Sequence, residues 1–494
     1  MTGIPMDSRE SLLRGYLAGR FDPRDGLCYT QGTEWTPRRA CFFSQSTAMM
    51  GLLRWYRETG SPEARRLLDR QADGLLRVAV DRGSHVCFPK YEFDGEKYVN
   101  EPRDTEAPPW YGGRLILPLV DYWQLSGRED VRAFLDKLVR HVTEVSTFIK
   151  PDGEVERGDG WWGHLHSTQD MVAGICEYGR LTGRRGLVEW ARRVYEWIGR
   201  THTTRYGWVA DVSGGRICES CSIASRVRLG LALWRAGVAD PFDEIDRHVR
   251  NQLLENQFVD LDFMARPVPA TPRTERVTYA GVDRMIRGTF QCWGTANDLI
   301  GNEDVEGCGT GGGVQGLALA WDAQYDWQDH PAGRELRVHL LFNRRLRSPP
   351  ASPLTTGTPL AAELWSWLPN QGRVAVAAHL PLARLALRLP AGTDETTLRL
   401  IRTGTGKPSL DYPAPPLDGC YLIVTSVQPG ERIELRFALQ KSETTETAAG
   451  VRYRASWQGN AIRSLEPPGA KVPLYRQRAH QLDQPVSLTS PRYP

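Results

Sequence analysis

Two cysteines and a glutamate stand together just ahead of one predicted helix. Cys218, Glu219 and Cys221 precede the segment SIASRVRLGLALW. Cysteines three residues apart lie on one face of a first helical turn, where the positive end of the helix dipole lowers the pKa of a thiol. A thiolate binds metal or attacks carbon, and the carboxylate between the cysteines adds an oxygen ligand. The segment therefore indicates a metal or nucleophile site, and small residues packing at a helix start are the alternative.

A further cysteine lies in a glycine-rich segment, EGCGTGGG, which opens the predicted helix Val314–Tyr325. Glycines let the backbone approach a ligand closely, and their N–H groups can hold an anion. The segment lacks the spacing and the lysine of a phosphate-binding P-loop, so we do not expect a nucleotide. Cys308 is thus a second candidate thiol, with Glu306 beside it as a candidate acid.

A third group of chemically active residues, WWGHLHSTQD, stands at the head of another predicted helix. Flat aromatic rings stack on the apolar faces of sugars, so Trp161 and Trp162 are candidates for substrate binding together with His164, His166 and Asp170. Because the two histidines alternate, we expect one to face the cavity and the other to pack backward. A loop or capping hydrogen bond is the alternative explanation for either histidine alone.

A repeated helical pattern must position these groups. Helix ends closed by glycine recur at Gly60, Gly127, Gly183 and Gly237, and an amphipathic stretch follows each one. Glycine adopts the left-handed conformation that ends a helix, and apolar residues at i, i+3, i+4 and i+7 mark one buried face. Repeated helix pairs form either a closed (α/α)6 barrel or an open solenoid. We expect the barrel, because the connecting loops are long and rich in reactive side chains.

From Glu335 onward the pattern changes to runs of period two, such as ELRVHLLFN, GRVAVAAHL, RIELRFAL and VRYRASWQG. Such runs, separated by turn residues, predict an antiparallel β-sandwich. We therefore expect an (α/α)6 helical-hairpin barrel over residues 1–330, which carries the sugar-binding and catalytic loops. A β-sandwich over 331–480 and a polar tail over 481–494 follow.

Length and composition narrow the class of protein further. A chain of 494 residues is too long for one core, and its net charge of +3 comes without basic runs interleaved with aromatics, which argues against a nucleic-acid partner. No apolar run approaches the ~18 residues of a membrane-spanning helix, and the first residues lack the apolar segment of a secretory signal. Nine cysteines, an odd number at irregular spacing, favour reduced thiols. We expect a cytoplasmic protein without a membrane partner, and a homodimer through the sandwich face is compatible with the pattern.

Taken together, these segments resemble the β-L-arabinofuranosidase-like glycoside hydrolases of family 127. The resemblance runs from Gly163 to Arg478 and rests on GHLHSTQDMVAGICEYGRLTG, ICESCSIASRVRLGLAL, DEIDRHVRNQLLENQ, EGCGTGGGVQGLALAWDAQY, LRVHLLFN and YRASWQGNAIRSLEPPGAKVPLYRQR. It implies an (α/α)6 barrel followed by a β-sandwich, with an oligosaccharide or glycoside as substrate.

The resemblance also implies a zinc ion held by one glutamate and three cysteines, one of which is the nucleophile. Glu219 and Cys221 match the first two ligands, and Cys308 matches the nucleophilic cysteine. The position of the last ligand holds Gly309. Three outcomes stay open here: the zinc keeps a vacancy for water or substrate, Cys218 takes the place, or no metal binds.

The acid/base glutamate of the family has no counterpart in this sequence. It should lie near Thr204, where the segment TTRYGWVADVSGGR contains no glutamate and has Asp211 as its only carboxylate. Asp211, Glu306 and Asp170 are therefore the substitutes that the sequence offers for the general acid and base.

Three functions are compatible with these residues. The prediction is a glycoside hydrolase that uses Cys308. A uronate-directed lyase or unsaturated-uronyl hydrolase on the same scaffold would rely on His164, His166 and Asp170, with loop arginines binding the uronate carboxylate. A non-catalytic sugar-binding protein would explain the missing cysteine and glutamate.

Overall fold

A computed structural model describes residues 20–29, 42–88, 109–156, 164–211, 215, 217–259, 261, 286–300, 307–349, 358–404, 409–413 and 417–486. The chain forms two compact units. The first comprises Met1–Thr201, Val212–Gly214 and Arg228–Ala239, and the second comprises His202–Asp211, Gly215–Val227 and Asp240–Pro494. The division runs through helix α9 (Ser220–Arg235). It does not coincide with residue 330, where the sequence pattern changes from helical to extended.

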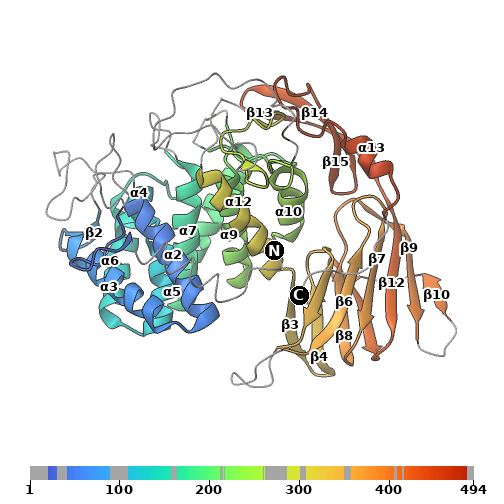
Figure 1. The fold of residues 1–494 in the computed structure, drawn as a ribbon, viewed down its shortest axis with the longest axis horizontal. Coiled ribbons are helices and arrows are strands. Elements are labelled where there is room, and N and C mark those ends of the chain that lie inside the picture. The colour runs from blue at the N-terminus through green and yellow to red at the C-terminus, as the bar shows by residue number, and fades with distance from the viewer. Residues whose placement is uncertain are drawn as a thin grey trace. The chain divides into compact units, whose positions relative to one another are not determined.

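Helical hairpins build the first unit (Figure 1). They are α2 (Phe42–Thr59) with α3 (Pro62–Val78), α5 (Ile116–Ser126) with α6 (Glu129–Arg140), and α7 (Leu165–Leu181) with α8 (Arg185–Thr201). The short helix α4 (Trp110–Gly113), a π-helical turn at His141–Val145 and the small hairpin β1 (Val80–Asp81) and β2 (Val86–Cys87) lie between them in the chain. Within the described residues, no helix is both long and apolar enough to cross a membrane.

The four glycines predicted to end helices all adopt the left-handed conformation. Their φ angles are 65° at Gly60, 67° at Gly127, and 70° at both Gly183 and Gly237. Nothing lies within 4 Å of the position that a Cβ would take at any of them. Glycine is therefore required at these turns by the backbone alone, and the predicted helix ends are confirmed.

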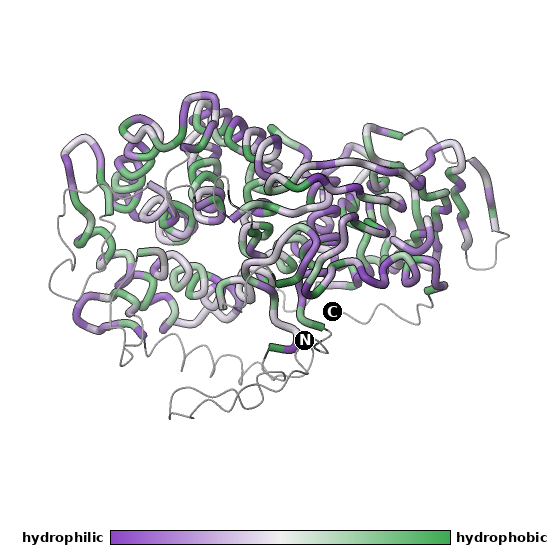
Figure 2. Tube along the Cα trace, turned by 90° about the horizontal axis from the view of Figure 1, so that it is seen from above, coloured by the Kyte–Doolittle hydropathy of each residue, from purple (hydrophilic) through white to green (hydrophobic). Residues whose placement is uncertain are grey.

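The helices differ in how much of their surface they bury. Hydrophobic and hydrophilic stretches alternate along the helical part of the chain (Figure 2). Helix α3 buries one face, formed by residues such as Leu67, Leu68 and Leu75. Helix α7, in contrast, is buried at every residue from Leu165 to Cys176, which is typical of a helix surrounded by other elements. Of the histidines that the sequence singled out, His164 immediately precedes this helix and His166 lies in its first turn.

Three described helices of the second unit precede its strands. They are the first half of α9, then α10 (Phe242–Arg247), which continues into a π-helical turn at His248–Leu253, and α12 (Gly307–Asp322). The sequence predicts the last of these over Val314–Tyr325, but the observed helix begins seven residues earlier and ends at Asp322. The glycine-rich segment is therefore helical, and the expectation of an anion-holding turn ahead of the helix is corrected.

Two sheets form the β domain of the second unit (Figure 1). Their strands are β3 (Tyr325–His330), β4 (Gly333–Val338), β5 (Arg344–Arg347), β6 (Leu360–Ser366), β7 (Arg373–Ala378), β8 (Leu382–Arg388), β9 (Thr393–Thr403), β10 (Leu410–Pro413), β11 (Tyr421–Val427) and β12 (Arg432–Leu439). One sheet has the order β10-β9-β12-β7-β6-β5 and the other β11-β8-β4-β3. All neighbours are antiparallel except β4 and β8, which are parallel, so the expectation of a purely antiparallel sandwich needs this correction. The first strand already begins at Tyr325, inside the range that the sequence assigned to the helical part.

One apolar core joins these two sheets into a sandwich. Leu336, Leu385 and Leu422 contribute to it from one sheet, and Leu364 and Ile433 contribute from the other. All five side chains are fully buried. The period-two alternation of the sequence is thus explained, because alternate side chains of each strand point into this shared core.

A separate three-stranded sheet follows the sandwich. It consists of β13 (Lys441–Ala448), β14 (Val451–Gln458) and β15 (Ala461–Glu466). The run VRYRASWQG, which the sequence assigned to the sandwich, therefore belongs to a different sheet. Helix α13 (Arg478–Asp483) then buries Arg478 and Leu482, so the tail predicted from residue 481 begins within a helix.

Candidate metal centre

Glu219, Cys221 and Cys308 converge in the second unit. The Cys221 Sγ lies 2.9 Å from Glu219 Oε2 and 3.5 Å from the Cys308 Sγ, and the Cys308 Sγ lies 3.5 Å from the same carboxylate oxygen. One ligand atom from each residue lies within 4.8 Å of the other two, close enough for all three to hold one metal ion. Residues that are 87 positions apart in the sequence thus form one cluster.

Two helix N-termini position this cluster. Glu219 immediately precedes α9, Cys221 lies in its first turn, and Cys308 lies in the first turn of α12. The partial positive charge at the start of a helix stabilises a thiolate or carboxylate placed there. Two such ends that meet at one point favour a group of negatively charged ligands.

Glycines allow α9 and α12 to approach each other this closely. A Cβ at Gly312 would lie 2.2 Å from the Cβ of Cys221, and a Cβ at Gly316, one turn further on, would lie 3.2 Å from the Cβ of Ala224. A Cβ at Gly313 would lie 2.1 Å from the ring of Phe290. Real Cβ atoms do not come as close as at Gly312 and Gly313, so a larger residue there would force its neighbours to move, and at Gly312 these neighbours include the Cys221 backbone. The contact at Gly316 is tight but milder. The glycine run therefore serves helix packing.

A cysteine that the sequence analysis missed completes the cluster. The Cys292 Sγ lies 3.2 Å from Glu219 Oε1 and 3.8 Å from the Cys308 Sγ. The indole N–H of the next residue, Trp293, donates a hydrogen bond of 2.6 Å to the same carboxylate oxygen. In the sequence, Cys292 has no second cysteine nearby at the spacing of metal ligands, and it does not lie at the start of a predicted helix. The adjacent Trp and Gly in the segment QCWG were the only available signal.

Cys218 does not take part in the cluster in the way the sequence allowed. Its Sγ contacts the backbone oxygen of Glu219 at 3.4 Å, on the main chain and not on the carboxylate. Its backbone pairs with Gly294 through hydrogen bonds of 2.8 and 2.9 Å. Burial raises the pKa of this thiol. Cys218 thus anchors the segment that carries Cys292.

Burial and mutual repulsion govern the charges of the cluster. Glu219, Cys221 and Cys292 are each 2% exposed, whereas Cys308 is exposed. Burial raises the pKa of Glu219 to about 8, with further contributions from the negative charges of Asp211 and Cys308. Burial also raises the pKa of Cys221. Buried acids held this close need a compensating positive charge to ionise together, and sulfur with carboxylate oxygen is a donor set that suits zinc. The residues therefore fit a zinc ion.

Of the candidate acids that lie within the described residues, Asp211 is the one beside the cluster. It is 2% exposed, and its Oδ1 accepts a hydrogen bond of 3.5 Å from the Ser222 hydroxyl. A carboxylate oxygen of Asp211 lies within 4.8 Å of one from Glu219. The structure thus brings together Asp211, Glu219, Cys221 and Cys308 from the residues that the sequence proposed.

Asp170, in the first unit, has a different environment. It is fully buried between two guanidinium groups: Arg114 donates from Nε to Asp170 Oδ2 at 3.0 Å, and Arg228 pairs with Asp170 Oδ1. A carboxylate between two guanidinium groups binds both of them through strong charge-assisted hydrogen bonds. This arrangement indicates a structural role in the helix packing.

His164 and His166 are both buried, at 4% and 5% exposed. Their rings lie 5.5 Å apart with an edge toward a face, and His164 Nδ1 lies 2.9 Å from the Ser167 hydroxyl. The expectation that the two rings point in opposite directions is corrected. His164 stands just before α7 as its N-cap, with an extended backbone, and His166 lies in the first turn, so neither strand nor helix spacing fixes their relative orientation. Trp161, Trp162 and Glu306 lie outside the described residues.

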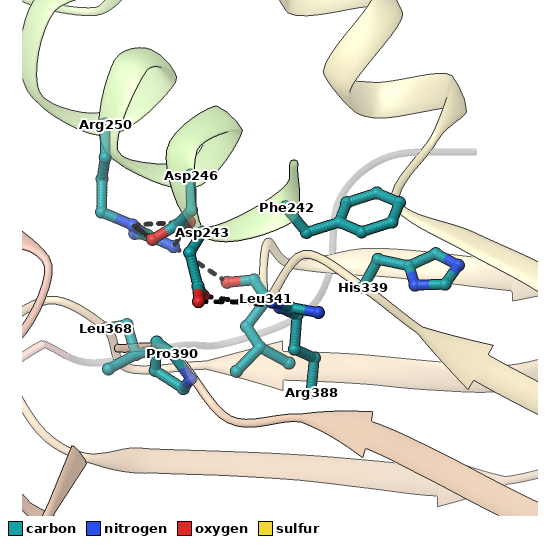
Figure 3. A pocket seen from close by; sticks show the side chains of 9 residues that line it. All are labelled: Phe242, Asp243, Asp246, Arg250, His339, Leu341, Leu368, Arg388 and Pro390. Atoms are coloured by element: carbon teal, nitrogen blue, oxygen red, sulfur yellow. Dashed lines mark hydrogen bonds and ion pairs between the residues drawn. The ribbon is translucent and has the colours of Figure 1, made fainter. Parts of the chain in front are cut away.

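A pocket elsewhere in the second unit is lined by acidic side chains that are already paired with arginines (Figure 3). It is lined by Phe242, Asp243, Asp246, Arg250, His339, Leu341, Leu368, Arg388 and Pro390. Its acids are already paired, since Arg388 lies 3.2 Å from Asp243 and Arg250 lies 3.0 Å from Asp246. The ring of His339 stacks on Phe242 at 4.1 Å. These contacts join α10 to the sandwich, so the pocket lies where these two parts of the unit pack against each other.

Comparisons with known proteins support the fold. No protein-family model matches the chain, and a search of curated proteins finds no match. Solved structures do match. A family-127 β-L-arabinofuranosidase from Geobacillus stearothermophilus aligns at 12% identity over 92% of this chain and 72% of its own, with a TM-score of 0.57. A second family-127 β-arabinofuranosidase aligns at 14% identity over 92% and 71% with a TM-score of 0.59, and a structure described as a glycoside hydrolase aligns at 13% over 92% and 73% with a TM-score of 0.57.

These alignments confirm the predicted fold class, a helical barrel followed by a β domain. The chain is thus structurally similar to the family-127 enzymes over 92% of its length. At 12 to 14% identity the likeness concerns the fold, and fold by itself does not define the reaction.

Proposed function

We propose that this protein is a carbohydrate-active enzyme, a glycoside hydrolase whose nucleophile is the Cys308 thiolate. The observation that carries the proposal is one exposed sulfur backed by buried acidic ligands: Cys308 is exposed, while Glu219 and Cys221 behind it are each 2% exposed. A substrate can reach only the outer sulfur of such a cluster. Because the structural relatives are described as β-L-arabinofuranosidases, L-arabinofuranosides are the first substrates to test.

The reaction would proceed in two displacements at the anomeric carbon. In the first, the Cys308 sulfur forms a bond to this carbon while the bond to the leaving oxygen breaks, and a carboxylic acid gives that oxygen a proton. In the second, water attacks the same carbon, the carbon–sulfur bond breaks, and the carboxylate takes a proton from the water. Cys308 leaves as a thiolate. Two inversions at one carbon give a product with retained configuration.

Asp211 is our candidate for the group that gives and later takes the proton. It is buried, and its carboxylate lies within 4.8 Å of that of Glu219. A carboxyl group beside the proposed nucleophile is what the transfer of a proton to the leaving oxygen requires. Glu306, two residues before Cys308 in the chain and outside the described residues, is the alternative.

We further propose that Glu219, Cys221 and Cys308 hold a zinc ion. When bound, zinc supplies positive charge that keeps the coordinating thiols deprotonated at neutral pH. Glu219 and Cys221 orient the Cys308 sulfur through their contacts of 3.5 Å with it. Cys308 also lies in the first turn of α12, where the positive end of the helix dipole stabilises the thiolate form of its sulfur.

Turnover of a panel of aryl glycosides that includes β-L-arabinofuranosides tests the proposal. We expect Cys308→Ala to abolish turnover and Asp211→Asn to lower it by about 100-fold or more. A slow substrate should leave a sugar adduct on Cys308 that mass spectrometry detects. Cys420→Ala is the matched control, because Cys420 is also an exposed cysteine but lies in the β domain. Full activity of Cys308→Ala would overturn the proposed nucleophile, and sugar binding without any turnover would point to a non-catalytic protein.

A further inference from the structure

We propose that Cys292 is a third sulfur ligand of the metal centre. It takes the place of the ligand that the family pattern has at position 309, where this chain has Gly309, although it comes from another segment of the chain. This inference rests on the metal centre proposed above. Cys292 lies 3.2 Å from Glu219 Oε1 and 3.8 Å from the Cys308 Sγ. With it, three sulfurs each lie within 3.5 Å of a carboxylate oxygen of Glu219, and three sulfurs with one carboxylate make the four ligands of a tetrahedral zinc site.

The space beside position 309 is occupied by the segment that carries Cys292. A Cβ at Gly309 would lie 2.4 Å from the backbone oxygen of Gln291 and 3.0 Å from the backbone nitrogen of Cys292. These neighbours are main-chain atoms, which cannot turn aside as a flexible side chain can. A side chain at position 309 and the present path of the Gln291–Cys292 backbone therefore exclude each other. The chain places its third thiol on the segment that fills this space.

Hydrogen bonds hold this segment against the start of α9. The Ser220 hydroxyl donates to the Gln291 backbone oxygen at 2.8 Å, and the Gln291 side-chain amide donates to the Cys218 backbone oxygen at 3.3 Å. Gly294 exchanges two backbone hydrogen bonds with Cys218. Residues on both sides of Cys292 are thus tied to the residues that flank Glu219.

The backbone between these anchors adopts an unusual conformation. Trp293 has a φ of 66°, in the left-handed region that residues other than glycine rarely occupy. Such a conformation persists only where the surroundings stabilise it, and it occurs often at functional sites. Here it allows two adjacent side chains, those of Cys292 and Trp293, to contact the same Glu219 carboxylate.

Trp293 acts as a positioning residue for Glu219. Its indole N–H donates to Oε1 at 2.6 Å, while Oε2 lies nearest to the sulfurs of Cys221 and Cys308. The hydrogen bond fixes the orientation of the carboxylate, as outer hydrogen bonds do for carboxylate ligands in metal sites. The segment thus supplies one ligand and orients another.

X-ray absorption on the purified full-length protein loaded with zinc counts the sulfur ligands directly. We expect three sulfurs at about 2.3 Å in the wild type. In Cys292→Ser we expect two sulfurs and a loss of zinc affinity of about 100-fold or more. Cys218→Ser, which changes a neighbouring buried cysteine with no contact to the carboxylate, should retain all three. The double variant Cys292→Ala, Gly309→Cys should not recover the third sulfur, because the Gln291 backbone oxygen still fills the space.

The outcomes separate this inference from the proposed hydrolase. Two sulfurs in the wild type, or three in Cys292→Ser, would overturn the role of Cys292 without affecting Cys308 as a nucleophile. A wild type that binds no zinc would overturn the metal centre and this inference together, and the turnover assay judges the hydrolase separately. Circular dichroism checks that the variants fold, and the sulfur count of the wild type stands even if a variant does not.

Discussion

Gly312 of α12 faces Cys221 of α9 so closely that a Cβ at position 312 would lie 2.2 Å from the Cβ of Cys221. The contact brings the first turns of the two helices together, and with them the sulfurs of Cys221 and Cys308 at 3.5 Å. The candidate metal centre therefore depends on the absence of a single methyl group. This relationship gives a direct way to separate the geometry of the cluster from its chemistry.

Gly312→Ala should disrupt the cluster without removing any ligand. The added methyl group must displace α12 from α9, and overpacking of this kind typically costs about 1–3 kcal/mol of unfolding free energy. We expect weaker zinc binding and lower stability in chemical denaturation. Gly311→Ala is the control, because Gly311 lies in the same helix with nothing within 4 Å of its Cβ position. That control should be neutral or more stable by up to about 1 kcal/mol, since alanine favours the helix. Equal effects of the two variants would contradict the packing role of Gly312.

Asp170→Asn should destabilise the first unit strongly. The change leaves the buried guanidinium groups of Arg114 and Arg228 without the charge that compensates them, and breaking a buried ion pair costs about 3–5 kcal/mol. Thermal and chemical unfolding measure the loss. Asp121→Asn removes an exposed ion pair with Arg57 and should cost at most about 1 kcal/mol. If Asp170→Asn unfolds like the wild type but loses turnover, Asp170 is catalytic and its structural role is refuted.

The cysteines should differ in their reactivity toward iodoacetamide. Cys308 and Cys420 are exposed, whereas Cys28 and Cys218 are buried. Burial raises the pKa of Cys28 to about 11 and also raises the pKa of Cys218, so both stay protonated at neutral pH. A short labelling pulse followed by mass spectrometry should modify Cys308 and Cys420 in the native protein. Added zinc should protect Cys308 and leave Cys420 unaffected. Protection of both thiols, or rapid labelling of native Cys218, would contradict this assignment.

Stability should fall as the solution becomes acidic because of His248. Burial lowers the pKa of this histidine from 6.5 to about 4, against the opposing effect of Glu244. Above pH 6.5 the ring is neutral in both states; below it, the unfolded chain takes up a proton that the folded protein does not accept. Between about pH 7 and about pH 5 this difference should remove about 2 kcal/mol of unfolding free energy. The contribution is lost progressively as the pH falls toward 4.

His248→Asn is the test of that assignment. Its side-chain amide can replace the hydrogen bond of 2.8 Å that His248 Nδ1 makes with the Glu244 backbone oxygen, and it does not titrate. We expect the variant to lose about 2 kcal/mol less than the wild type over the same pH interval in urea denaturation. Parallel pH profiles for the two proteins would exclude His248 as the source.

The local features of this chain could be predicted from its sequence because local physics produces them. Gly60, Gly127, Gly183 and Gly237 end helices because glycine readily adopts the left-handed conformation, and period-two runs form strands. Glu219 and Cys221 were recognisable because they lie two residues apart at a helix start. Cys308 was recognisable through its glycine-rich surroundings and the resemblance that they carry.

Only the tertiary structure decided which groups meet at the cluster. Cys292 lies 73 residues from Glu219, in a segment without helical or strand periodicity, and its place depends on the path of a backbone that no local pattern encodes. The role of the glycine run also depended on the residues that pack against it, because Gly312 is required by the position of Cys221 and not by its own φ angle. The burial of Asp170 between two arginines had the same origin, since Arg114 and Arg228 are 56 and 58 residues away. Local sequence defines the elements, whereas contacts between distant segments define the site, because close packing selects among side chains only after the elements have docked.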